Sequence, residues 1–79
     1  MWVQPEQYQG VGAVLAAARR QANLSQAELA RRLQKPQSVV SQLETGQRRL
    51  DLVEFLAVTR ALNADPLEIF AEMVRSLSK

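Results

Sequence analysis

The segment 36–45 is dense in uncharged side chains that form hydrogen bonds. Val40 and Leu43 mark the inward side of a helix by their spacing. The opposite, solvent-facing side then carries the amides and hydroxyls of Gln37, Ser38, Ser41, Gln42 and Thr45. A helix face that is only solvated usually carries lysine and glutamate, so this composition favours a hydrogen-bonded partner. Base edges suit such side chains, because a glutamine amide can pair with N6 and N7 of adenine and a serine hydroxyl donates or accepts.

A strong helix-start signal precedes this segment. Ser25 and Glu28 have the spacing of a capping box, in which each side chain satisfies a backbone N–H of the other residue. Leu24 and Leu29 flank the box as a hydrophobic staple. The pattern predicts a helix over 26–34.

A proline then separates two helices. Pro36 lacks an N–H and is tolerated at the first position of a helix but not inside one. We therefore expect a second helix over 36–45, with Gly46 following its C-cap. Only Gln34 and Lys35 remain to connect the two helices.

Similar signals predict three further helices. Apolar spacing and capping residues place them over 10–22, 52–63 and 66–77, and no segment has the pattern of a strand. Residues 1–9 show no period and are expected to form an extended arm, either packed on the domain or frayed. The expected fold is an all-α, compact five-helix bundle over 10–79.

The composition excludes several classes of protein. Seventy-nine residues supply one hydrophobic core and not two. The chain has no cysteine and no histidine, which excludes thiolate nucleophiles, imidazole bases and the common zinc sites, and neither an enzyme nor a cofactor is expected. No apolar run approaches the roughly 18 residues of a membrane helix, and no signal-peptide pattern is visible. We expect a cytoplasmic protein without membrane contact.

The charge is distributed unevenly along the chain. The net charge is only +2, but residues 1–50 hold seven basic and three acidic side chains, whereas 51–79 hold three basic and five acidic ones. This asymmetry favours a first half that faces a polyanion and a second half with another role. Surface arginines are often merely solvated, so the charge alone does not decide the partner.

Two helices joined by so short a turn form either a helix-turn-helix unit or an ordinary bundle hairpin. The stretch SQAELARRLQKPQSVVSQLETG resembles the Cro/cI-type (XRE) helix-turn-helix family. The match rests on Gln26, Leu29, Ala30, Val40, Leu43, Glu44 and Gly46, and the resemblance extends over about residues 10–75. The family often has glycine in the turn where this chain has Gln34. Either the turn is built differently, or Gln34 accepts the strain of a left-handed conformation.

The resemblance implies a lambda repressor-like fold and a regulator that binds double-stranded DNA, with the helix over 36–45 in the major groove. The base-reading residues would be Gln37, Ser38, Ser41 and Gln42. Phosphates would be bound by Gln26, Lys35, Thr45, Gln47, Arg48 and Arg49, although each loop arginine has the alternative of being only solvated. Arg19 and Glu44 occupy positions that form a structural ion pair in some members of the family.

The helix over 66–77 is apolar in two directions. One stripe consists of Leu67, Phe70, Val74 and Leu77, and Ile69 and Met73 lie on another. A small domain can cover one stripe, so the other is either part of a broad core-facing surface or free for a second copy of the chain. We expect a homodimer on a two-fold operator, with an interface formed by Leu67, Phe70, Met73, Val74 and Leu77.

Two functions from different classes follow. The first is a sequence-specific, dimeric transcriptional regulator that acts as a repressor or autoregulator. The alternative is a protein-interaction module on the same scaffold, such as an antiactivator or the partner of a toxin. A regulatory protein partner is compatible with both. The uncharged polar face over 37–45 favours DNA, and salt-dependent binding to random duplex would separate the two.

Overall fold

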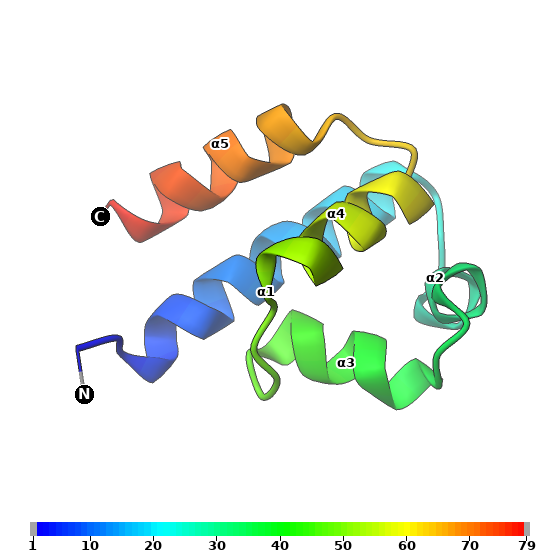
Figure 1. Ribbon diagram of the computed structural model, residues 1–79, viewed down its shortest axis with the longest axis horizontal. Coiled ribbons are helices and arrows are strands. Elements are labelled where there is room, and N and C mark those ends of the chain that lie inside the picture. Colours follow the sequence, from blue (N-terminus) through cyan, green and yellow to red (C-terminus); the bar gives the residue numbers. More distant parts are fainter. Residues whose placement is uncertain (1, 79) are drawn as a thin grey trace.

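The computed structural model describes residues 2–78, and five helices account for most of them. They are α1 (Pro5–Gln21), α2 (Gln26–Leu33), α3 (Gln37–Thr45), α4 (Leu52–Ala61) and α5 (Pro66–Leu77). α1 is the central element: it contacts α3 on one side and α5 on the other, while α4 bridges α2 and α5 (Figure 1). No strand occurs in the described range. The expected all-α, five-helix bundle is confirmed.

The first helix begins earlier than the sequence analysis predicted. Pro5 occupies its first turn, where a missing N–H costs nothing, and the backbone N–H of Gln4 donates to Oε1 of Gln7 at 2.8 Å. The extended arm expected over 1–9 is therefore wrong for residues 5–9, which form the first turns of α1. Met1 and Lys79, at the ends of the expected arm and domain, lie outside the described residues.

The predicted helix start at Ser25 is confirmed. The backbone N–H of Glu28 donates to Oγ of Ser25 at 3.0 Å, and the N–H of Ser25 donates to Oε1 of Glu28 at 2.9 Å. Asp51 and Glu54 form the same reciprocal pair at the start of α4. These pairs satisfy N–H groups that have no partner within the helix, so each one fixes where its helix begins.

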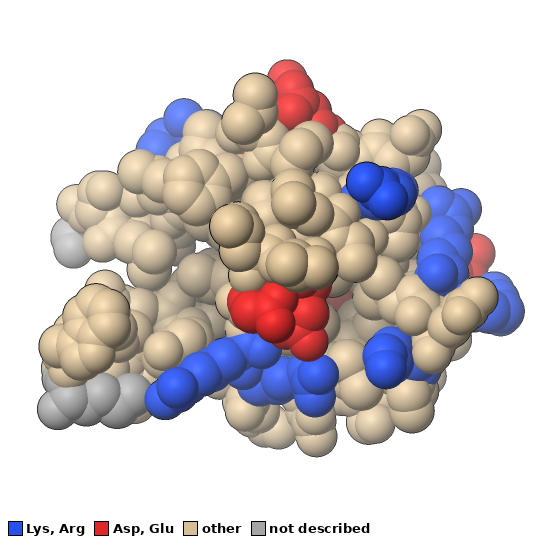
Figure 2. Space-filling view, viewed as in Figure 1, with Lys and Arg blue, Asp and Glu red and all other residues tan. Residues whose placement is uncertain are grey.

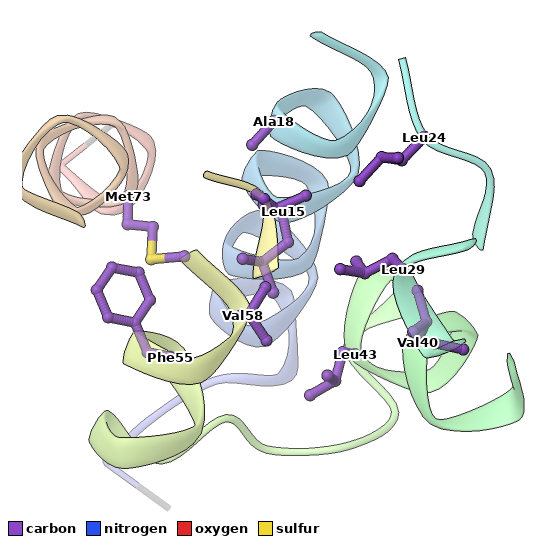
Figure 3. Close-up of a cluster of buried hydrophobic side chains, with 11 residues drawn as sticks. Leu15, Ala18, Leu24, Leu29, Val40, Leu43, Phe55, Val58 and Met73 are labelled. Atoms are coloured by element: carbon purple, nitrogen blue, oxygen red, sulfur yellow. The ribbon is translucent and has the colours of Figure 1, made fainter. Parts of the chain in front are cut away.

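One hydrophobic core joins all five helices. Leu15 of α1, Leu29 of α2 and Val40 of α3 are each at most 3% exposed, and they belong to the same buried cluster as Phe55 and Val58 of α4 (Figure 3). From α5, Met73 reaches toward the ring of Phe55 (Figure 3). Burial of these side chains, each contributing about 1.5–3 kcal/mol, holds the short helices together.

α1 and α3 cross at Gly12, and the crossing leaves no room for a side chain. A Cβ at this position would meet the carbonyl oxygen of Leu43 at 2.5 Å and would lie closer still to that of Glu44. Both oxygens belong to the backbone of α3, which cannot move without moving the helix. Glycine at position 12 therefore allows the backbone of α3 to pack this closely against α1.

Candidate nucleic-acid interface

The turn between α2 and α3 is built on a strained glutamine. Gln34 has φ 57° and ψ 43°, the left-handed conformation that glycine adopts most easily. The N–H of Lys35 donates to the carbonyl of Ala30 at 3.0 Å and closes the end of α2. The turn therefore keeps left-handed geometry, with Gln34 accepting the strain. Pro36 is the residue before α3 rather than its first residue, because its ψ of 151° is extended.

α3 presents an uncharged polar face to solvent. Gln37, Ser38 and Gln42 are exposed and Ser41 is half-buried, whereas Val40 and Leu43 on the opposite side are buried in the core. Gly46 ends the helix in a left-handed conformation with φ 80°. The four side chains expected to read bases thus project from one helix on one surface of the molecule.

Basic and polar residues flank this face at both ends. Lys35 is exposed in the turn before α3, and Gln47, Arg48 and Arg49 are exposed after it. Figure 2 shows basic side chains gathered over the loop that follows α3, directly below an acidic patch at the start of α4. The hydroxyl of Thr45 donates to the carbonyl of Ser41 at 2.9 Å, which leaves its oxygen as an acceptor only.

Both loop arginines already have partners within the protein. Nη2 of Arg48 lies 3.2 Å from Oε2 of Glu54. The guanidinium of Arg49 lies 5.5 Å from the centre of the Tyr8 ring, within the range of a cation–π contact. Both side chains remain exposed, and the sequence analysis did not anticipate either partner. A phosphate would therefore compete with Glu54 for Arg48.

The ion pair expected between Arg19 and Glu44 is present. Nε of Arg19 lies 2.6 Å from Oε2 of Glu44 and Nη2 lies 3.1 Å from Oε1, so the guanidinium is bidentate. Nη1 of Arg19 also donates to the carbonyl of Leu24 at 2.7 Å. The hydrogen bond to Glu44 raises the pKa of Arg19 above its usual value, although burial opposes the shift. The pair ties α1 to α3 and is 10% exposed on the arginine side and 6% on the glutamate side.

Glu44 also contacts the residue that begins α2. Nε2 of Gln26 donates to Oε1 of Glu44 at 2.9 Å. Nε2 of Gln37 in turn donates to Oε1 of Gln26 at 3.3 Å. A continuous line of hydrogen bonds therefore runs from Arg19, through Glu44 and Gln26, to the polar face at Gln37. Sequence analysis named all four residues but not this connection.

α5 leaves part of its apolar surface uncovered. Leu67 is 77% exposed, and Phe70, Val74 and Leu77 on the same stripe are also exposed. Met73 is only 5% exposed and packs in the core. The two predicted stripes thus have different positions: one faces the domain, and the other is largely exposed, although the ring of Phe70 also lies edge-on to the buried ring of Phe55, with the ring centres 6.2 Å apart. Met73, although expected at the interface, belongs to the stripe that faces the domain.

The remaining chemistry of the described residues is limited. Within residues 2–78, no group of three acidic side chains lies close enough to hold a metal ion. None of the helices in this range is long and apolar enough to cross a membrane.

Comparison with known proteins decides the family. A family model described as Helix-turn-helix matches residues 15–69, which is more than half of the chain. A solved XRE-family like protein from Pseudomonas syringae pv. tomato is 36% identical, with 94% of this chain and 89% of that chain covered and a TM-score of 0.77. The chain belongs to the XRE family of helix-turn-helix proteins.

Two further solved structures are similar to the present chain. The restriction-modification controller protein C.AhdI from Aeromonas hydrophila is 33% identical, with 85% of this chain and 100% of that chain covered and a TM-score of 0.73. The controller protein C.Esp1396I, solved as a tetramer on its 35-base-pair operator, is 18% identical, with coverages of 92% and 96% and a TM-score of 0.80; this likeness shows the fold alone. None of the curated proteins compared with the chain matches it significantly.

Membership of the family confirms the general function. This XRE-family protein is a DNA-binding transcription regulator and not an enzyme. The roles of individual side chains on α3 and in its flanking loops stay predictions, because no comparison tests them.

Proposed function

We propose that this protein is a dimeric repressor that reads a two-fold operator by inserting α3 into the major groove. The observation that carries the proposal is the face of α3, where amides and hydroxyls are exposed and charged side chains are confined to the flanks. Hydrogen-bonding side chains read base edges, and cations at the flanks bind phosphates. Gln37 is the leading reader, because it stands in the first turn of α3 and is oriented by Gln26.

The exposed stripe of α5 supports the dimer. Leu67, Phe70, Val74 and Leu77 form an apolar surface at the end of the described fold, and such a surface is unusual in a small monomer. A second copy of the chain would cover it symmetrically. Two copies of α3 would then face half-sites about 34 Å apart, one turn of DNA.

The test of base reading is a comparison between specific and random DNA. Selection from a random duplex pool gives the preferred site, and the variant Gln37→Ala is then measured on that site and on random duplex. We expect a loss of ~1–3 kcal/mol on the selected site and almost none on random DNA. An equal loss on both would contradict base reading by Gln37.

The matched variant for phosphate binding is Arg48→Ala. It should weaken binding to both duplexes and reduce the slope of log affinity against log salt by about one unit. A wild-type protein without salt-dependent binding to random duplex would contradict DNA binding as a whole and would favour a protein partner instead.

The dimer is tested with Leu67→Asp, because this side chain is 77% exposed and its replacement leaves the monomer core intact. Light scattering should show a dimer for the wild type and a monomer for the variant. Glu68→Ala, at an exposed neighbouring position outside the apolar stripe, is the control and should remain a dimer. A wild type that is monomeric at high concentration and also on DNA would overturn this part of the proposal.

Repression is tested by fusing the promoter of the protein's own gene to a reporter. Expression should fall when the protein is supplied and recover with Gln37→Ala. A rise in expression would indicate activation.

A further inference from the structure

We propose that the buried carboxylate of Glu44 is a positioning residue that makes Gln37 selective for adenine over guanine. The inference rests on the proposed function of α3 as the reading helix. Glu44 itself would not touch DNA, because its side chain is only 6% exposed and lies against α1. Its effect would pass through the amide of Gln26.

The carboxylate is held in one orientation. The bidentate contact with Arg19 fixes both of its oxygens, and Arg19 is itself held by the carbonyl of Leu24. The glutamate therefore has little freedom to rotate and presents Oε1 toward the start of α2. An ionised carboxylate only accepts hydrogen bonds.

This property determines which way round the Gln26 amide lies. Only its Nε2 can face Glu44, and the observed distance to Oε1 is 2.9 Å. Its Oε1 must then point away from Glu44, where it accepts a hydrogen bond from Nε2 of Gln37 at 3.3 Å. The second N–H of Gln26 remains able to donate to a phosphate.

The direction of the Gln26 amide sets what Gln37 offers to a base. One of the two N–H groups of Gln37 is used by Gln26, which leaves one donor and one acceptor for DNA. Adenine presents one acceptor, N7, and one donor, the N6 amino group, and so it is complementary. Guanine presents two acceptors, N7 and O6, and would need both N–H groups of Gln37.

A reversed Gln26 amide would have the opposite effect. Its nitrogen would donate to Oε1 of Gln37 and free both N–H groups of Gln37 for guanine. Glu44 excludes this arrangement, because reversal would place the Gln26 oxygen against a carboxylate oxygen. The negative charge of Glu44 thus fixes the orientation of the Gln26 amide, and this amide in turn makes Gln37 prefer adenine.

The test uses Glu44→Gln, which has nearly the same shape but an amide that can donate or accept. The base that Gln37 contacts is first identified as the one at which Gln37→Ala loses its selectivity. Two duplexes then carry the selected site with either adenine or guanine at this base. The ratio of affinities for the two duplexes should fall about five- to a hundredfold in Glu44→Gln, the worth of one bidentate contact. Random-duplex binding should be retained.

A structural effect of Glu44→Gln is separated by three further variants. Arg19→Lys weakens the same ion pair but keeps a carboxylate that can only accept, so it should lower stability while reducing the adenine preference much less than Glu44→Gln does. Gln26→Met removes the relay without touching the ion pair, and it should lose the preference even if Glu44→Gln fails to fold. In a Gln37→Ala background, Glu44→Gln should change the ratio no further.

Several results would overturn the proposal. The first is an unchanged ratio of adenine-duplex to guanine-duplex affinity in Gln26→Met. The second is a fall in this ratio in Arg19→Lys that is as large as the fall in Glu44→Gln. The third is a selected site with guanine at the base that Gln37 contacts. Each of these leaves salt-dependent binding to DNA intact, whereas failure of the proposed function would abolish it. The two failures are therefore distinguishable.

Discussion

Replacing Gly12 by alanine should push α3 away from α1, weaken the fold and displace the polar face of α3. The added Cβ would lie 2.5 Å from the carbonyl oxygen of Leu43, whereas ordinary carbon–oxygen contacts are about 3.3–3.6 Å. α3 must therefore retreat by roughly 1 Å. Such overpacking costs ~1–3 kcal/mol, and the better helix propensity of alanine returns ~0.5–1 kcal/mol.

The net loss for Gly12→Ala is then about 0–2.5 kcal/mol, which corresponds to a fall in Tm of up to roughly 20 °C for a domain of this size. Urea unfolding followed by circular dichroism measures the loss of stability directly. Gly10→Ala is a matched control on the same helix, because its Cβ would meet only the movable hydroxyl of Ser76, at 2.9 Å. It should be neutral or stabilising by up to about 1 kcal/mol. If both variants were stabilised alike, the close crossing of α1 and α3 would be refuted.

Two further predictions concern the helix ends. Gln34→Gly relieves the strain of a left-handed glutamine and should raise the free energy of unfolding, measured in urea, by about 1 kcal/mol. Asn63→Gly, at a similar φ of 55°, should be stabilised less, because asparagine tolerates this conformation. Equal stabilisation in the two variants would contradict the argument. The hydrogen bonds from Ser25 lower the pKa of Glu28 below its usual 4.5, so ionised Glu28 favours the folded state above this pH and its contribution is lost as the pH falls further. Glu28→Gln should therefore lose less stability than the wild type between pH 5 and pH 3, and parallel pH profiles would exclude a role for this carboxylate.

The helix starts were predictable because their determinants are local. Ser25 with Glu28 satisfies N–H groups within one turn, so the pattern is visible in four consecutive residues. The start of α1 was missed because it depends on glutamines, which are weak capping residues, and because Gly10 and Gly12 interrupt the apolar period. The role of Gly12 is set by α3, some thirty residues away in the chain, and nothing near Gly12 indicates it.

The polar face of α3 was predictable for a similar reason, but the hydrogen bonds behind it were not. The spacing of Val40 and Leu43 defines which side of α3 is buried, and the polar residues follow from it. The hydrogen bonds that join Gln26 to Glu44 and Arg48 to Glu54 connect separate elements, and their partners depend on how those elements pack. Sequence spacing places residues on faces, but only the tertiary arrangement shows which polar atoms meet.

The pairing of Arg48 with Glu54 limits how strongly this loop would hold DNA. An arginine that must leave a carboxylate to reach a phosphate contributes slightly less to binding any DNA sequence than a free arginine does, because an exposed ion pair is worth about 0–1 kcal/mol. Glu54 is also held at the start of α4 by the N–H of Asp51, so its negative charge would stay near the DNA if Arg48 moved to a phosphate. Weaker attraction to phosphates would shorten the time spent on each wrong site, and binding would then depend more on the contacts that α3 makes with bases.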